Sequence, residues 1–435
     1  MGYLEKKAKL ATELVADVLD DFAEEKPVHH VEPQRGPGED RKKLRALVER
    51  LSAVFSHHPE VLDARVSADI AWARRYLVTS EGTRLAVAGE NVPSMLSMTA
   101  ISRAPDGMRL RAHRMWTFRD IEGLPPEAEL AAEAQALAGE LAADSRAEVQ
   151  SPVAGPAILD PEMTGVLFHE ALGHKLEGQR QRDPQQSQLF KDQVGKKVIP
   201  EFLSLWDDPT MAEFKGQPLH GHYRYDDEGV PAQKVVLVER GILKNFLMSR
   251  WPVKGFSRSN GHGRADSKLR PTGRMANLMV RAEVMIPRAK LKDRLMELAR
   301  KQGKPYGFIL SGAFGGENPN GREAAQTLEV RPRRVYRVDA ITGQETLVRG
   351  VSLVGTPLIM LNRIVAAGDD VTLANGFFCG AESGYVPVNQ IAPSVLVSDV
   401  ELQRLPEDLA RPPILASPFH EVDEAMAVGK PGKAR

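Results

Sequence analysis

The sequence predicts an α+β protein with two domains, and three observations lead to that prediction. The chain has 435 residues, which is too long for one ordinary hydrophobic core. Helical and strand-like patterns do not alternate along it as they would in a doubly wound fold. Residues 149–158 contain two prolines and a glycine, which is typical of a boundary. We therefore expect an N-terminal α/β domain over residues 1–150 and a larger, β-rich domain over residues 151–435, which carries a metal-binding helix.

The N-terminal pattern begins with apolar residues four apart, which predict an amphipathic helix over residues 4–25. A polar segment rich in Pro and Gly then predicts a linker over residues 26–42. The elements expected after it are helices over residues 41–55 and 126–143 and strands over residues 64–68 and 76–79.

The C-terminal pattern has one strong helix signal, over residues 160–177, and then turns mainly to strands. A hairpin is expected to turn at Glu239, Arg240 and Gly241. The other expected elements are a helix over residues 291–302 and strands over residues 328–339, 348–355 and 393–402.

The composition excludes several classes of function. Lys plus Arg and Asp plus Glu number 58 each, so no net charge favours nucleic acid or an anionic membrane as a partner. The charged N-terminus is unlike a signal peptide, and the longest apolar stretch is interrupted by Pro357, Asn362 and Arg363. The single cysteine, Cys379, allows no intrachain disulfide. We therefore expect a cytoplasmic protein that does not span a membrane.

The segment from Phe168 to His174 carries the clearest chemical signal. Asp160 and Pro161 form a good helix start before it. Glu170, His174 and Glu177 recur at i, i+4 and i+7, so they share one helical face. In the H-E-x-x-H helix of metallopeptidases, two histidines four apart bind zinc and the glutamate is the general base.

The two histidines of this segment, His169 and His174, are five residues apart, so a regular helix would place them roughly 140° apart. A turn of the i→i+5 kind would bring them toward one face, and Gly173 is where the backbone deforms most easily. We therefore predict a π-type turn or a helix break between Ala171 and His174. The alternative is a partly buried helix whose histidines and glutamate are satisfied by neighbours.

Two further places offer candidate residues. Cys379 lies between Gly376 and Gly380, and it is either a zinc-bound thiolate or a buried free thiol. His262 and Arg264 stand in a glycine-rich segment that is either a ligand-contacting loop or an ordinary turn.

The sequence resembles the TldD/PmbA metallopeptidases, a family also called modulators of DNA gyrase. The resemblance runs from about residue 150 to residue 400 and rests on motifs that occur in family order. These motifs are GVLFHEALGHKLEG, YRYDDEGVPAQKVVLVERGILKNFLMSR, RSNGHGRA, GRMANL, LVRGVSLVGTPL and FFCGAESGYVPVNQIAPSVLV. The spacing of the two histidines is the signature of the family.

The resemblance implies that His169, His174 and Cys379 bind Zn²⁺ and that Glu170 is the general base of a catalytic, TldD-like peptidase. It also implies unfolded or small peptides as substrates and a homodimer, or a heterodimer with a paralogous subunit. For such a peptidase, His262 and Arg264 are our candidates for stabilising an oxyanion.

The resemblance has one departure and leaves one alternative. Family members usually begin with a further β-rich part, so the N-terminal domain is expected to be incomplete relative to the family, with any leader peptide lost. The alternative function is a non-catalytic or modulatory zinc-binding subunit of a dimeric peptidase.

Overall fold

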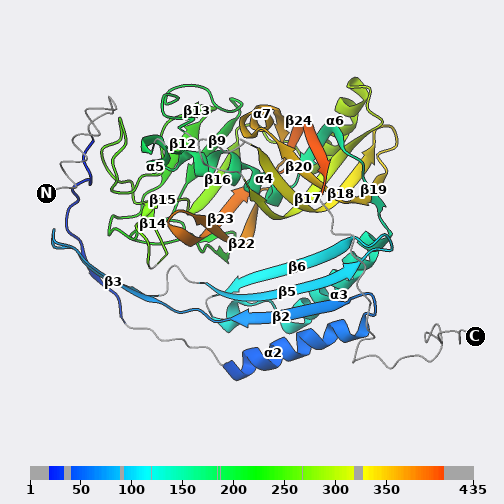
Figure 1. Cartoon of the computed structure of the whole chain (residues 1–435), viewed down its shortest axis with the longest axis horizontal. Coiled ribbons are helices and arrows are strands. Elements are labelled where there is room, and N and C mark those ends of the chain that lie inside the picture. Colours follow the sequence, from blue (N-terminus) through cyan, green and yellow to red (C-terminus); the bar gives the residue numbers. More distant parts are fainter. Residues whose placement is uncertain are drawn as a thin grey trace, which may run out of the picture.

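The computed structural model describes residues 19–33, 41–88, 93–118, 120–183, 185–186, 188–266, 268–317 and 327–405, with the backbone alone for residues 88 and 375–377. Within these ranges the chain is a mixed α and β protein in which strands predominate (Figure 1). Among the described helices, none combines the length and the apolar character that crossing a bilayer requires.

The N-terminal part contains two small sheets. One has the order β1 (His29–Val31), β4 (Arg84–Ala88), β3 (Arg74–Val78), and the other has the order β2 (Asp63–Asp69), β5 (Ser94–Arg103), β6 (Arg109–Phe118). Helices α2 (Arg41–Val54) and α3 (Glu127–Arg146) pack on the second sheet, and short 3-10 turns lie at Phe55–His57 and Ile121–Gly123. The predicted helices over residues 41–55 and 126–143 and both predicted strands are therefore confirmed.

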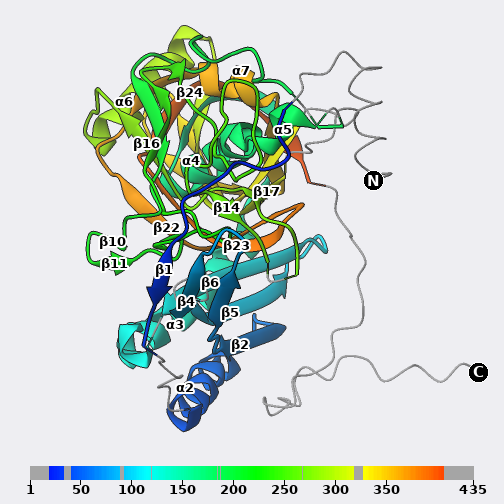
Figure 2. The same cartoon turned by 90° about the vertical axis from the view of Figure 1, so that its left-hand side faces the viewer.

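Two N-terminal predictions are corrected. Residues 19–25 are not helical: they form a bend and irregular coil beside the C-terminal part, where the Ala23 amide donates to the Arg250 carbonyl oxygen at 2.7 Å. Figure 2 shows this segment passing along the C-terminal part before it reaches β1. The remainder of the predicted helix, residues 4–18, lies outside the described residues. The predicted linker contains β1, which pairs in parallel with β4, and its residues 34–40 also lie outside the described ranges.

The largest sheet closes on itself. Strands β17, β8, β24, β20 and β18 follow one another, and β18 pairs back onto β17, which gives a barrel-like ring. Strands β19, β7 and β21 extend it. The strands of this sheet are β7 (Glu148–Val149), β8 (Val153–Leu159), β17 (Tyr306–Glu317), β18 (Leu328–Asp339), β19 (Glu345–Arg349), β20 (Val351–Gly355), β21 (Ile364–Ala367) and β24 (Val395–Arg404).

A six-stranded sheet lies beside this ring, in the order β13, β12, β9, β16, β23, β22. Its strands are β9 (Leu203–Asp207), β12 (Val235–Glu239), β13 (Ile242–Leu243), β16 (Asn277–Ala282), β22 (Thr372–Ala381) and β23 (Gly384–Ala392). Two-stranded ribbons are formed by β10 (Glu213–Phe214) with β11 (Gln217–Pro218) and by β14 (Gly263–Arg264) with β15 (Thr272–Gly273). The predicted hairpin is confirmed, because Arg240 and Gly241 take the positive φ values of a tight turn between β12 and β13.

Helix α4 (Pro161–Phe168) lies between the two sheets, against β17 on one side and against β22 and β23 on the other (Figure 1). A π-helix, His169–Gly173, and a 3-10 turn, His174–Leu176, continue it, and α5 (Gln179–Arg182) comes next. Helices α6 (Arg288–Lys301) and α7 (Pro357–Asn362) complete the described helices. Because both sheets pack on the same helical segment, α4 and the π-helix are buried on several sides.

The buried apolar side chains form separate clusters on either side of residue 150. One cluster draws on residues 44–149 and the others on residues 153–402. This separation supports the predicted division between residues 1–150 and 151–435, which stays a prediction. The segment predicted as a boundary differs from expectation in one respect: β8, one of the strands of the ring, occupies its second half. The prolines of this segment precede or accompany the strand and do not interrupt it.

Candidate metal centre

The start of α4 is fixed by the residues that the sequence indicated. Asp160 is the N-cap, and its Oδ1 accepts a hydrogen bond from the Met163 amide at 2.8 Å. Pro161 occupies the first turn, where its missing N–H costs nothing. Asp160 Oδ2 also accepts from Ser311 Oγ at 2.8 Å, which ties the helix start to β17. The helix that leads to the histidines is therefore anchored on the ring.

The predicted change of helical type is confirmed by a π-helix over His169–Gly173. The wider turn brings the rings of His169 and His174 together, with centroids 4.8 Å apart and planes nearly perpendicular. A Cβ on Gly173 would clash with the sulfur of Met275, so this turn can approach the neighbouring segment only because the residue is glycine. The spacing of five residues thus produces one pair of adjacent imidazoles.

Cys379 approaches this pair from β22, the edge strand of the six-stranded sheet. Its Sγ lies 3.3 Å from His174 Nε2, and one donor atom from each of Cys379, His169 and His174 lies within 4.8 Å of the other two. All three side chains are buried. The structure therefore brings together the three residues for which the sequence predicted a common site.

The histidine on the 3-10 turn is oriented by a carboxylate. Glu177 Oε1 lies 3.0 Å from His174 Nδ1, and because a carboxylate only accepts, Nδ1 carries the proton. In the neutral ring, the Nε2 that faces Cys379 is then the nitrogen with a free lone pair for a metal. His169 differs, since its buried Nδ1 has no hydrogen-bond partner among the described residues.

These three groups fit a zinc ion. Tetrahedral zinc with bonds of about 2.0–2.3 Å keeps its nitrogen and sulfur ligands roughly 3.3–3.8 Å apart. Burial by itself would raise the pKa of the Cys379 thiol, but His174 and His169 lower that pKa well below its usual value. A buried thiolate beside two imidazole nitrogens is a donor set typical of zinc.

Glu170 lies beside the cluster on the first turn of the π-helix. It is half-buried, and its Cγ lies so close to Gly316 of β17 that a Cβ there would clash with it. Burial raises the pKa of Glu170 above its usual value, and the neighbouring histidines counteract that rise. A carboxylate in this setting accepts a proton more readily than an exposed one.

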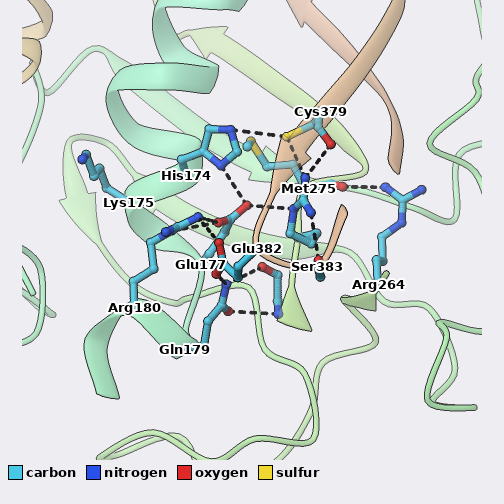
Figure 3. A network of polar contacts seen from close by, with 12 residues as sticks. His174, Lys175, Glu177, Gln179, Arg180, Arg264, Met275, Cys379, Glu382 and Ser383 are labelled. Carbon is cyan, nitrogen blue, oxygen red and sulfur yellow. Dashed lines mark hydrogen bonds and ion pairs between the residues drawn. The ribbon is translucent and has the colours of Figure 1, made fainter. Parts of the chain in front are cut away.

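A buried polar network surrounds the cluster (Figure 3). Arg274 donates from Nη2 to the Cys379 sulfur at 3.1 Å, and Arg180 donates to Glu177 Oε2 at 2.6 Å. Burial opposes the charge on Glu177, yet His174, Arg180 and Arg274 together lower the pKa of this carboxyl to about 2. Two buried cations thus accompany the carboxylate and the thiolate.

Neither Arg180 nor Arg274 was predicted from the sequence to belong to the site. Arg274 stands in GRMANL, which carried the family resemblance, and Arg180 follows Glu177 by three residues, a spacing that predicts contact on one helical face. That spacing was the available signal for Arg180. No local pattern places Arg274 beside Cys379, because they belong to segments 105 residues apart.

Arg264 lies on β14 and His262 directly precedes this strand, and both are hydrogen-bonded to interior groups. His262 Nε2 lies 3.2 Å from Asp207 Oδ1. Arg264 donates to the carbonyl oxygens of Met275 and Pro387 at 2.6 and 2.9 Å, and its guanidinium lies over the ring of Tyr223. Both are buried. Figure 3 shows Arg264 reaching Met275 from the side opposite His174. Neither His262 nor Arg264 belongs to the group of three donors.

Residues 153–404 match the family model described as the PmbA/TldA metallopeptidase C-terminal domain. This match covers more than half of the chain and includes every residue of the cluster. The chain belongs to the PmbA/TldD family. Within this family, its relatives include a metalloprotease of Methanocaldococcus jannaschii, 30% identical over 325 residues that make up 74% of this chain and 66% of the relative.

Other relatives match over a shorter stretch. A zinc metalloprotease TldD homolog of Saccharolobus solfataricus is 29% identical over 256 residues, 58% of this chain and 52% of the relative. A metalloprotease of Archaeoglobus fulgidus is 34% identical over 240 residues, 55% of this chain and 51% of the relative. The chain thus spans about half to two thirds of the length of these three relatives.

Solved structures of family members have the same fold. A modulator of a DNA gyrase from Thermotoga maritima superposes with a TM-score of 0.64 at 18% identity, over 89% of this chain and 81% of the other. TldE from Thermococcus kodakarensis superposes with a TM-score of 0.58 at 16% identity, over 87% of this chain and 80% of the other. The β-rich part with its barrel-like sheet is therefore the fold of the family.

Proposed function

We propose that the chain is a zinc-dependent endopeptidase in which His169, His174 and Cys379 hold the metal and Glu170 is the general base. The observation that supports this most directly is the convergence of two imidazoles and one thiolate, all buried, beside a half-buried carboxylate. The names of the relatives as metalloproteases agree with the same class of reaction.

The protein's own groups account for the proton movements. A zinc ion held by the three donors supplies Lewis acidity, which activates water and polarises a carbonyl group. Glu170 takes up the proton of the attacking water at its carboxylate and then transfers it to the leaving amine nitrogen. The raised pKa of Glu170 suits both halves of this transfer, because the carboxyl group holds the proton long enough to pass it on.

A structural zinc site explains the geometry less well. Such a site is closed by four protein ligands, whereas the described residues provide a group of three His and Cys donors. Glu170 next to His169 has no part in a structural site. The modulatory, non-catalytic subunit is therefore the weaker alternative.

A thiol hydrolase is a second candidate, because one line of contacts has the order of a cysteine triad. Cys379 Sγ lies 3.3 Å from His174 Nε2, and Glu177 Oε1 lies 3.0 Å from Nδ1 of the same ring. That mechanism leaves His169 and Glu170 without a function, whereas the zinc mechanism uses all of them. A chelator distinguishes the two, since it abolishes the zinc-dependent activity and spares the thiol-dependent one.

Unfolded or small peptides are the substrates that we propose. Cys379 lies on an edge strand, and an extended peptide can pair with the main chain of such a strand with little sequence preference. Folded proteins do not offer a free extended segment. Small esters tested beside peptides show whether the site selects amides.

His262 and Arg264 remain our candidates for the oxyanion. Replacing either by Ala is expected to lower kcat by about 10²–10³-fold with zinc retained. Because both residues make interior hydrogen bonds, either substitution can also lower stability, so the thermal unfolding of each variant is measured together with its activity. Unchanged turnover in a folded, zinc-loaded variant refutes the assignment for that residue.

The assembly as a homodimer, or as a heterodimer with a paralogous subunit, also stays a proposal. Light scattering of the zinc-loaded protein measures the mass of the assembly. A doubled mass for the protein alone indicates the homodimer, and a mixed dimer that forms only with the paralogue indicates the heterodimer.

The main test is hydrolysis of an unfolded peptide mixture by the zinc-loaded protein and its Glu170→Gln variant. Cleavage by the wild type that disappears in the variant, with zinc content unchanged, is the expected result. Equal activity in both contradicts the role of Glu170.

A further inference from the structure

Glu177 is shared by three buried partners. Its Oε1 accepts from His174 Nδ1 at 3.0 Å and forms an ion pair with Arg274 Nε at 3.3 Å. Its Oε2 accepts from Arg180 Nε and Nη2 at 2.9 and 2.6 Å. The side chains of Glu177 and Arg274 are both 0% exposed. The carboxylate is therefore held on two sides while it orients the imidazole.

Arg274 makes the connection to the other side of the cluster. Its Nη2 donates to the Cys379 carbonyl oxygen at 2.6 Å and to the Cys379 sulfur at 3.1 Å. Its Nη1 donates to Ser383 Oγ at 2.8 Å and to the Gly384 carbonyl oxygen at 2.9 Å. One planar guanidinium thus contacts both ends of the turn between β22 and β23 and the carboxylate that orients His174.

We propose that Arg274 is a positioning residue for the metal site: it holds the Cys379 sulfur facing His174 and, through Glu177, fixes the ring of that histidine. The two ligands come from a helical turn and a strand 205 residues apart, so neither local segment can set their separation. Arg274 contacts both the Cys379 sulfur and the Glu177 carboxylate, and its guanidinium holds the donors to them in a fixed planar fork. This inference rests on the zinc site proposed above.

A lysine cannot replace this fork. Its single ammonium group reaches either the sulfur or the carboxylate, but it does not reproduce the fixed angle between them. We expect Arg274→Lys to weaken zinc binding by about 10–100-fold, as loss of such outer partners does in metal sites. Competition with a chromophoric zinc chelator measures this change without any activity assay.

A second readout reports on the sulfur itself. With Co²⁺ in place of zinc, the thiolate-to-cobalt charge-transfer band is expected to shift or weaken in Arg274→Lys. A folded Arg274→Lys variant with wild-type zinc affinity and an unchanged cobalt spectrum would overturn the proposal. Should that variant fail to fold, Ser383→Ala removes one acceptor of the guanidinium without altering a ligand and is expected to show the same changes, smaller in size. No change in Ser383→Ala would then count against the proposal.

Arg250→Lys is the matched control. Arg250 is also a buried arginine in an ion pair, with Glu81, and it donates to the Ala23 carbonyl oxygen at 2.9 Å. Neither of these partners belongs to the metal cluster, so we expect a lower unfolding temperature and wild-type zinc affinity. An equal loss of zinc affinity in this control would show a general effect of lost stability and would contradict a specific role of Arg274.

The link through Glu177 has its own test. If Arg274 acts partly through Glu177, the losses of zinc affinity in Arg274→Lys and Glu177→Gln are not additive in the double variant. Additive losses would refute the link. A wild-type chain that takes up no zinc would instead refute the metal site itself, so the two failures are distinguishable.

Discussion

At the scale of single residues, the site depends on side chains whose ordinary behaviour is altered by burial and by each other. Cys379 is buried and yet has a lowered thiol pKa, because the imidazoles of His174 and His169 lie beside its sulfur. His174 carries its proton on Nδ1 because Glu177 accepts it there. The sequence motif identifies the residues of the site, but these contacts determine the protonation and orientation of each side chain.

The thiolate gives a residue-scale prediction. Loss of an outer partner weakens metal binding by about 10–100-fold. We expect Cys379→Ser to weaken zinc binding by more than this, because an alcohol is a far poorer zinc ligand than a thiolate. Chelator competition measures the affinity, and Glu170→Gln serves as control because it leaves all three donors in place. Full zinc retention in Cys379→Ser would remove Cys379 from the ligand set.

At the scale of elements, the π-helix is the feature on which the site depends. It accommodates the five-residue spacing of the histidines, and Gly173 lets it pack closely on Met275. The helix start at Asp160 and the contact of Glu170 with Gly316 hold the same segment against β17. Strand β22 then supplies the third donor from the opposite side of α4.

Gly173→Ala tests this packing. The added methyl group would clash with the Met275 sulfur, so we expect the free energy of unfolding to fall by about 1–3 kcal/mol and zinc affinity to fall with it. Chemical denaturation and chelator competition measure the two effects.

Gly139→Ala is the matched control for this substitution. Gly139 lies within α3, and nothing lies within 4 Å of its added Cβ, so the variant is expected to be up to about 1 kcal/mol more stable than the wild type. Equal stability of Gly173→Ala and the wild type would mean that the close contact at the π-helix is not required.

At the scale of the whole molecule, ion pairs join the N-terminal part to the C-terminal part. Arg250 pairs with Glu81, and Arg75 pairs with Asp227. Beside them lies Glu228, a buried carboxyl whose Oε2 accepts from the Arg250 amide at 2.6 Å. Burial, reinforced by the charge of Asp226, raises the pKa of Glu228 to about 8. A titrating carboxyl therefore lies at the junction of the two parts.

Glu228 predicts a pH dependence of stability. Because its pKa is raised in the folded state, the folded protein binds this proton more tightly than the unfolded chain does, and that stabilisation is lost as the pH rises through about 8. Glu228→Gln keeps the acceptor oxygen but does not ionise. We therefore expect the free energy of unfolding of the variant, relative to that of the wild type, to rise by about 1–3 kcal/mol from pH 5 to pH 9.

Denaturant unfolding of the zinc-loaded proteins at both pH values measures this gain. Glu122→Gln, at an exposed position, is the control and is expected to show no such difference. If the difference in free energy of unfolding between the wild type and Glu228→Gln is the same at both pH values, the raised pKa of Glu228 is contradicted.

The sequence by itself determined the family, the ligand residues proposed for zinc, and several helices and strands of the C-terminal part, among them α4, α6, β18 and β24. It did so because capping residues, turn residues and the histidine spacing are local signals whose physical meaning does not depend on distant contacts. The same locality explains the errors at residues 19–25 and at β1, where an amphipathic pattern forms irregular coil and a polar segment forms a strand, both against distant partners.

The tertiary structure alone decided which distant residues meet. It closed β17 and β18 into a ring, placed β22 opposite the π-helix, and brought Arg274 between Cys379 and Glu177. None of these contacts has a local signal, since strand pairing across long loops and buried ion pairs depend on the free energy of the whole fold. The chemistry of the ligands was readable in the sequence, whereas their geometry required the packing of two sheets on one helix.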